Sequence, residues 1–297
     1  MKYLSFILII SLYGYETIAQ QGSFAPQYDM EGTTAMHSDS TAFRTWATGC
    51  VVERGLRQIN LPDSGYATTG NANYAVGKPD APLVVSLGDG GSATLTFNGE
   101  IFDGPGFDFA VFENGFGSGE FAFLELAFVE VSSDGLNFLR FPSVSEQQTE
   151  NQLAAFSESD ASLFDNLAGK YVAMYGTPFD LADLPDTALL DKSAISHVRI
   201  IDVVGSINPE YGSMDRDSNQ INDSWPTNFA QSGFDLDAVG VINSTIPLSI
   251  AERSTNSSKN ENVCYSITGQ IIDCEQYGLK VTSSNNGSSI IYNRLAR

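Results

Sequence analysis

The stretch with the clearest potential for chemistry is "SMDRDSNQINDSWP", from Ser213 to Pro226, where oxygen-bearing groups recur at every second position. They match positions 1, 3, 5, 7 and 9 of an EF-hand-like calcium loop. These groups are the side chains of Asp215, Asp217 and Asn219, the backbone carbonyl of Ile221, and the side chain of Asp223. Such alternation lets a curled backbone direct successive oxygens at one ion, so the spacing predicts a structural calcium here.

Two features of an EF-hand are missing from this loop. Position 6 is Gln220, where the sharp turn prefers glycine, and position 12 is Pro226, where a bidentate glutamate would bind. We therefore interpret the stretch as a calcium loop of a β protein that remote ligands complete, and a solvated polar turn is the alternative. Asp235 and Asp237 in "GFDLDAVGVI" are the remote candidates, unless both simply alternate outward from a strand.

Aromatic side chains beside polar ones indicate a binding face, because flat rings stack on sugar faces while amides and carboxylates bind hydroxyls. Trp225 stands in the loop described above with Asn228 close by, and Glu113 and Asn114 end a predicted strand at a loop. We predict that these four residues contact a ligand. The alternative is that Trp225 is a core residue, as tryptophan more often is.

Signatures of catalysis are absent from the sequence. The chain has only two histidines, His37 and His197, and neither belongs to an H-E-x-x-H zinc motif. There is no G-x-S-x-G nucleophile elbow. Glu113 and Glu125 could serve as the paired carboxylates of a glycosidase, but chance pairs are expected in so acidic a chain. We predict no catalytic residue and keep a carbohydrate-active hydrolase as an alternative.

Short apolar runs separated by turn clusters fill the chain from residue 20 to residue 245. Runs such as "SATLTFNG", "FDFAVFEN", "SHVRIIDVVG" and "DLDAVGVIN" have the length and spacing of antiparallel strands. The fold predicted for this domain is therefore all-β, an antiparallel β-sandwich. Two segments, 145–169 and 180–195, are predicted as helical insertions.

One of these patterns resembles a known fold. "VEVSSDGLNFLRF", Val129 to Phe141, resembles the strand, Ser-Asp-Gly turn and aromatic strand of discoidin-like, galactose-binding-like jelly rolls. With "DGPGFDFAVFENGF", "VRIIDV" and "GFDLDAVGVI", the region from Gly70 to Asn243 is similar to a family of bacterial extracellular cell-surface proteins. The resemblance implies a binding module, and in such modules a structural calcium is often tied to the final strand, the place that Asp237 matches.

Both ends of the chain carry signals for export. "MKYLSFILIISLYGYETIAQ" has an early cation, an apolar run and small residues near Ala19, so residues 1–19 are predicted to be a cleaved signal peptide. Residues 246–261 read as a polar linker. Residues 262–297 resemble a shortened C-terminal sorting domain of type IX secretion in Bacteroidetes. That resemblance implies that the outer-membrane secretion machinery is a partner and that the protein is secreted or held on the cell surface.

The chain has three cysteines. Cys264 and Cys274 flank a predicted turn symmetrically about Gly269, so we expect them to face each other across a hairpin and form a disulfide. The alternative is a turn displaced by one residue, which would leave both thiols reduced. Cys50 is then expected to be a free thiol of the main domain.

Composition limits the choice of partner. With 36 acidic against 15 basic residues, the formal net charge is −21, which disfavours nucleic acid and anionic membranes as partners. The sequence as a whole predicts a calcium-stabilised, secreted or cell-surface protein that binds carbohydrate. The alternatives are capture of another nutrient such as a cobalamin-like cofactor, a carbohydrate-active hydrolase, and a structural or adhesive surface protein.

Overall fold

The structure is a computed structural model that describes residues 22–81 and 83–245, together with four strands further along the chain. The chain divides into two compact units, Met1–Ile246 and Pro247–Arg297. The predicted signal peptide, residues 1–19, and the predicted linker, residues 246–261, lie outside the described residues. In the part of the chain that is described, no helix has the length and apolar character to cross a bilayer.

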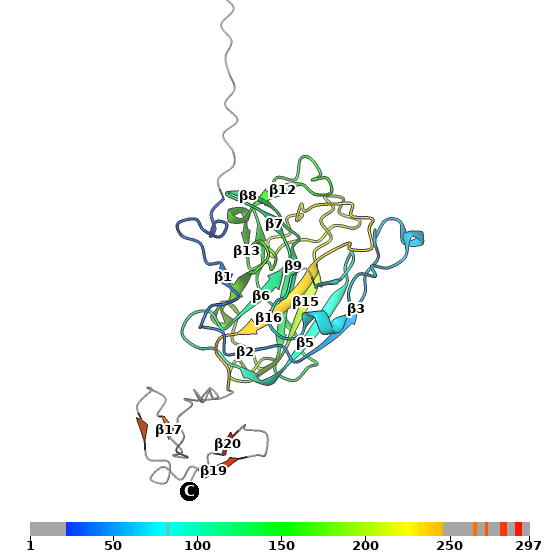
Figure 1. The fold of residues 1–297 in the computed structure, drawn as a ribbon. Coiled ribbons are helices and arrows are strands. Elements are labelled where there is room, and N and C mark those ends of the chain that lie inside the picture. Colours follow the sequence, from blue (N-terminus) through cyan, green and yellow to red (C-terminus); the bar gives the residue numbers. More distant parts are fainter. Residues whose placement is uncertain are drawn as a thin grey trace, which may run out of the picture. The chain divides into compact units, whose positions relative to one another are not determined.

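The first unit is an antiparallel β-sandwich, as the sequence predicted (Figure 1). One sheet has the strand order β1, β14, β6, β16 and β2, and β4 also pairs with β16. The bounds of these strands are β1 Met36–His37, β2 Thr45–Trp46, β4 Val85–Ser86, β6 Phe109–Glu113, β14 Tyr175–Phe179 and β16 Asp235–Val241.

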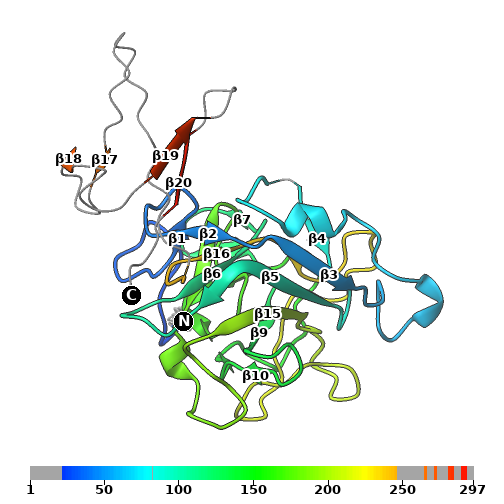
Figure 2. The ribbon, with the colours of Figure 1, turned by 90° about the horizontal axis from the view of Figure 1, so that it is seen from below.

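The second sheet has five strands in the order β10, β9, β15, β5 and β3, which can be followed in Figure 2. Their bounds are β3 Gly49–Glu53, β5 Ser92–Ile101, β9 Ala127–Ser132, β10 Leu139–Arg140 and β15 Ile195–Asp202. The strands β9 and β10 form the hairpin expected from "SSDG". Its turn contains Gly135 at φ 73°, a conformation that glycine adopts without steric cost.

The main core lies between the two sheets. Phe109 and Val111 of β6 share one buried cluster with Val129 of β9 and Ile200 of β15. All five residues of β6 are buried, so both faces of this strand are covered. The opposite face is covered because Phe112 packs on Phe43 and Trp46 from the N-terminal segment.

Three further pairings and four short turns complete the first unit. β11 pairs with β13, and β8 lies between β7 and β12, with bounds β7 Phe116–Gly117, β8 Phe121–Phe123, β11 Val144–Ser145, β12 Glu158–Asp160 and β13 Phe164–Asp165. The 3-10 turns are η1 Pro62–Ser64, η2 Ala72–Ala75, η3 Ala161–Leu163 and η4 Leu181–Asp183.

The two predicted helical segments, 145–169 and 180–195, form only single 3-10 turns among short strands and loops. The carboxylates of Asp160 and Asp180 cap η3 and η4 by accepting the N–H groups of Ser162 and Ala182. Each turn then ends at a residue with extended backbone, Phe164 or Leu184. The helical prediction was wrong for both segments because their apolar residues pack against sheet neighbours and not along one helix face.

The second unit contains two hairpins. β17 (Cys264–Tyr265) pairs with β18 (Ile271–Ile272), and β19 (Lys280–Ser283) pairs with β20 (Ser289–Tyr292). In the first hairpin the backbone register places Ile272 and not Cys274 opposite Cys264, so the expectation of a hairpin centred on Gly269 was wrong. Cys274 lies outside the described residues, so the disulfide stays a prediction. Cys50, in β3, is a half-buried free thiol as expected.

Candidate functional site

The predicted calcium loop is organised by its own hydrogen bonds. Oδ1 of Asp215 accepts the backbone N–H groups of Asp217 and Asn219, both at 2.9 Å. Oδ2 accepts the backbone N–H of Ser145 at 3.1 Å and the side-chain amide of Asn219 at 3.2 Å. The Asp215 carboxylate is buried, so these four bonds fix the loop and join it to β11.

The remaining predicted ligands in the loop have separate surroundings. Asp217 is exposed and contacts Arg216, with 3.4 Å between Oδ2 and the guanidinium Nε. The side chain of Ile221 is fully buried in a second apolar cluster beside the main core. Asp223 is buried as well, and its Oδ2 accepts the backbone N–H of Leu126 at 2.8 Å.

Asp237, the predicted remote ligand, lies in β16 and is fully buried. Its Oδ1 accepts the backbone N–H of Asp80 at 3.0 Å, whereas its Oδ2 has no hydrogen-bond partner. Burial raises the pKa of this carboxyl to about 6. No hydrogen bond joins Asp237 to the residues of the 215–223 loop within the described ranges.

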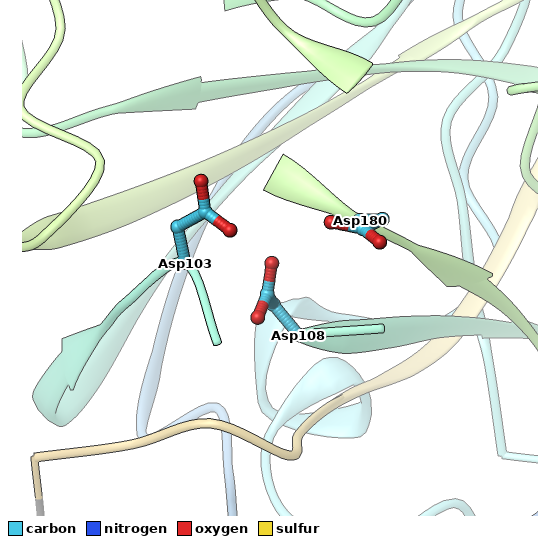
Figure 3. Close-up of side chains that lie close together, drawn as sticks. All are labelled: Asp103, Asp108 and Asp180. Carbon is cyan, nitrogen blue, oxygen red and sulfur yellow. The ribbon is translucent and has the colours of Figure 1, made fainter. Parts of the chain in front are cut away.

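One acidic group is compact enough to share a single ion. Within residues 22–81 and 83–245, Asp103, Asp108 and Asp180 are the only three acidic side chains whose oxygens lie within 4.8 Å of one another (Figure 3). The buried member, Asp108, already accepts hydrogen bonds from Gly104, Leu181 and Asn243 at 2.7–2.9 Å. These bonds tie together the loops at one end of β6, so the group has a structural role without an ion.

A pocket of about 350 Å³ opens near β7 and β8, which lie with β12 at one end of the first unit (Figure 1). Its volume falls in the range of roughly 300–1,000 Å³ that is typical of small-molecule sites. The lining residues are Asn114, Phe116, Phe123, Glu125, Phe156, Thr227, Phe229, Gln231 and Asp235. They combine aromatic walls with a few polar groups, the usual composition of a ligand site.

Two neighbouring strands of the first sheet place the polar residues of this pocket. β6 ends at Glu113 just before Asn114, and the antiparallel partner β16 begins at Asp235, so the two strand ends meet. The side-chain amide of Asn114 donates to Oδ2 of Asp235 at 3.3 Å. The next residue is glycine, and a Cβ at Gly115 would lie 2.9 Å from the backbone carbonyl oxygen of Phe123.

Four phenylalanine rings form a continuous aromatic wall along the pocket. Phe116 stacks on Phe123 with 4.8 Å between ring centroids, Phe123 lies 5.5 Å from Phe156, and Phe156 stacks on Phe229 at 5.4 Å. Phe116 and Phe156 are about 60% exposed, unusual for large apolar side chains, and Phe229 is 41% exposed. Phe156 also has a positive φ of 63°, a costly conformation for a bulky residue that places its ring over the pocket.

The floor of the pocket is acidic, and some of its carboxylate oxygens have no hydrogen-bond donor. Glu125 is only 8% exposed, and no donor in the described part of the chain forms a hydrogen bond with its carboxylate. Behind it, Glu113 is 1% exposed: its Oε2 accepts the N–H of Gly115 at 2.6 Å, but its Oε1 has no partner. Asp235 contacts the hydroxyl of Ser86 as well as Asn114.

Burial and mutual repulsion perturb these carboxyls. Burial raises the pKa of Glu113 and Glu125 well above the ordinary range, and the charge of Asp235 raises both further. Burial also raises the pKa of Asp235 to about 6, although hydrogen bonds from Ser86 and Asn114 oppose the change. Perturbed carboxyls in a pocket are a mark of functional sites.

Other buried carboxylates nearby accept hydrogen bonds from backbone N–H groups and so fix the surrounding loops. Asp202 accepts the N–H groups of Gly90 and Phe234 at 2.9 and 2.7 Å. Asp223 accepts those of Leu126 and Ser224, both at 2.8 Å. Glu125 differs from these two residues, because a buried carboxylate with a structural role normally accepts hydrogen bonds from nearby groups.

Trp225 has a different position from the one predicted. Its indole Nε1 donates to Asp89 at 2.9 Å, and its backbone N–H donates to the carbonyl of Leu153 at 3.1 Å. The half-buried Trp225 therefore links its own loop to two other segments of the chain. Neither Trp225 nor the exposed Asn228 lines the pocket, although Thr227 and Phe229 on either side of Asn228 do. Of the four predicted ligand contacts, Asn114 lies in the wall and Glu113 directly behind the floor.

A larger but shallower depression of about 540 Å³ lies elsewhere on the first unit. Two of its acidic groups have internal partners, since Asp186 pairs with Lys192 at 3.0 Å and the Asp191 carboxylate accepts two bonds from Ser193. The third, Asp103, belongs to the acidic group of Figure 3. Phe102 is the one aromatic residue in the lining, so this depression lacks an aromatic wall.

Sequence reasoning considered Glu125 only as one of a pair of carboxylates expected by chance, and it missed the phenylalanine wall. A signal for the glutamates was present, because Glu113 and Glu125 each interrupt an apolar run, "FAVFENGF" and "FAFLELAF". A charged residue inside a buried strand is rare unless it is paired or functional. No comparable signal exists for Phe156 and Phe229, which come from loops far apart in the chain.

No protein-family model matches this chain, and comparisons with curated proteins and with solved structures found no match either. The functional argument therefore rests on the residues of the pocket themselves.

Proposed function

We propose that this protein is an extracellular binding protein and that the phenylalanine pocket is its ligand site, with carbohydrate as the first ligand class. One observation carries the proposal: exposed aromatic rings, two amides and two carboxylates line a single pocket of about 350 Å³. Rings of this kind stack on the apolar faces of sugars, and the amides of Asn114 and Gln231 can bind hydroxyls. The volume is at the low end of the range for ligand pockets, which favours one or two sugar rings over a macrocyclic cofactor.

The cellular setting of this proposal comes from the ends of the chain. The predicted signal peptide and the sorting-like segment would carry the protein to the outside of the outer membrane. A ligand-binding sandwich there would capture its ligand from the medium or from a neighbouring surface.

A glycan array followed by isothermal titration calorimetry on the full-length protein tests the proposal. Phe229→Ala should weaken binding of any glycan found by at least tenfold, because the ring is part of the wall. Phe121→Ala is a matched control, since this side chain is equally exposed, at 41%, but does not line the pocket. Equal binding by wild type and Phe229→Ala would place the site elsewhere.

A second candidate function, hydrolysis of a glycoside, has one observation in its favour. Glu125 and Asp235 line the same pocket and both have raised pKa values, Asp235 to about 6. One could act as general acid and the other as base or nucleophile. Release of reducing sugar from the bound glycan, lost in Glu125→Gln, would favour this candidate over simple binding.

A further inference from the structure

The ionisable side chains of the pocket are all acidic. Glu125 and Asp235 line it, Glu113 lies behind it, and no basic side chain is among the lining residues. None of the ion pairs formed within residues 22–81 and 83–245 includes any of these three carboxyls. Placing several carboxyls in a buried site without a counter-charge costs free energy, so the fold retains an unfavourable arrangement at this point.

The one nearby cation is committed elsewhere. Arg54 lowers the pKa of Asp235 electrostatically, but its guanidinium donates to the backbone carbonyls of Thr69, Ser86 and Gly70. It forms no salt bridge with Asp235 in the described structure. None of the ion pairs of the described residues therefore neutralises the pocket carboxyls when they ionise, and a cationic ligand could do so.

Two glutamates at the floor of the pocket have carboxylate oxygens without a hydrogen-bond donor. Glu125 is 8% exposed as a residue, lines the pocket and accepts no hydrogen bond from the described residues, and Oε1 of Glu113 is a buried acceptor without a partner. The neighbouring Asp202 and Asp223 show that this fold can supply backbone donors to buried carboxylates. Glu125 lacks them at the one place that opens to a ligand.

The shape and composition of the site distinguish an organic cation from a bare metal ion. A metal needs several oxygens converging at about 2.0–2.6 Å from its centre. Yet no three acidic side chains around this pocket approach one another as closely as the Asp103 group does. A hard metal ion prefers oxygen ligands and gains little from an aromatic wall. An ammonium group, in contrast, is attracted to ring faces within about 6 Å.

We infer that the pocket takes a ligand bearing a positively charged nitrogen, an ammonium group on a sugar ring or apolar body, with Glu125 as its carboxylate partner. The body lies along Phe116, Phe123, Phe156 and Phe229, and the ammonium group lies between the rings and the acidic floor. This inference rests on the proposed function, because it names the ligand class of the same pocket. Amino sugars and aryl-alkyl amines satisfy both requirements.

Paired probes, in each of which a neutral group replaces the amine, test the inference on the full-length protein. One pair is the glucosamine trimer and the N-acetylglucosamine trimer, and the other is 2-phenylethylamine and 2-phenylethanol. By calorimetry at pH 7, the amine of each pair should bind at least tenfold more tightly than its neutral partner. This comparison uses the wild-type protein and does not depend on any variant folding.

Two variants then locate the effect. Glu125→Gln keeps the size of the side chain and removes its charge, so the preference for the amine should fall at least tenfold. Glu120→Gln is the matched control, because this glutamate lies in the exposed β7–β8 turn and outside the pocket lining, and it should retain the preference. Thermal melts of both variants confirm that they are folded.

Each outcome has a distinct meaning. Equal affinity for the amine and neutral sugars would overturn the inference and leave carbohydrate binding intact. Amine preference that survives Glu125→Gln would also overturn it, as would calcium binding that is lost in Glu125→Gln and blocks the amines. If only phenylethylamine binds, the ligand class stands and the carbohydrate proposal fails, and if no probe binds, both fail.

Discussion

The buried carboxyl of Asp237 gives a sharp test of the electrostatic reasoning. Its pKa is raised from 3.8 to about 6 by burial, with Oδ2 left unpartnered inside the sandwich. The folded state therefore holds the proton more tightly than the unfolded state. The sign follows directly: the ionisation cost is absent below about pH 4, grows as pH rises, and is complete above about pH 6.

Asp237→Asn removes that cost while keeping the hydrogen bond from Asp80, because the amide oxygen can take the place of Oδ1. A difference of about two pKa units corresponds to about 3 kcal/mol of unfolding free energy. At pH 4 the protonated acid and the amide are similar, so the variant and wild type should have nearly equal stability. At pH 7.5 the variant should be more stable by about 3 kcal/mol.

Urea unfolding of the full-length protein, followed by tryptophan fluorescence at both pH values, measures this difference. Asp63→Asn, in an exposed turn, removes the same charge without burial and should change stability equally at both pH values, within about 0.5 kcal/mol. The measurement should be repeated in calcium and in EDTA, because a calcium ligand at position 237 would reverse the sign in calcium. A stability change of Asp237→Asn that is the same at pH 4 and pH 7.5 would refute the reasoning.

Three further predictions concern the loop, the pocket and the C-terminal segment. Asp215→Ala should lower stability by about 2–4 kcal/mol in calcium and in EDTA alike, because it leaves backbone donors unpaired, whereas Asp217→Ala should change it by less than about 0.5 kcal/mol. A calcium-dependent rise in melting temperature that Asp217→Ala abolishes would instead support the calcium loop. Burial and the neighbouring carboxyls raise the pKa of Glu125, so binding of an ammonium probe should release protons. Its calorimetric heat should then differ between phosphate and Tris buffers, while that of the neutral probe should not. Finally, peptide mapping under non-reducing conditions should find Cys264 and Cys274 linked, and free thiols at both positions in secreted protein would exclude the bridge.

The strands of the sandwich could be predicted because each carries its own pattern. "SHVRIIDV" alternates apolar and polar residues and forms β15, and the apolar run in "GFDLDAVGVI" forms β16. In "SSDG" the turn residues specify the hairpin locally, with Asp134 accepting the N–H groups of Leu136 and Asn137. Periodicity and turn chemistry depend on neighbours in sequence, so one chain is enough to recognise them.

The pocket could not be predicted because its parts meet only in the folded chain. Asn114 and Asp235 are 121 residues apart and become neighbours through the pairing of β6 with β16. Trp225 looked like a ligand contact from its local surroundings, but its partner Asp89 is 136 residues away. The hydrogen bond from Ser145 to Asp215 could not be predicted for the same reason, because the two residues are 70 positions apart in sequence.

The direction of β16 determines how the protein presents its pocket. The strand begins at Asp235 in the pocket floor and ends at Val241, and the chain then runs past Asp108 to Thr245, whose backbone N–H donates to Glu100 in β5. Seven residues of extended strand separate the two ends by about 20 Å. Thr245, the last described residue of this unit, therefore follows the end of β16 that lies away from the pocket floor.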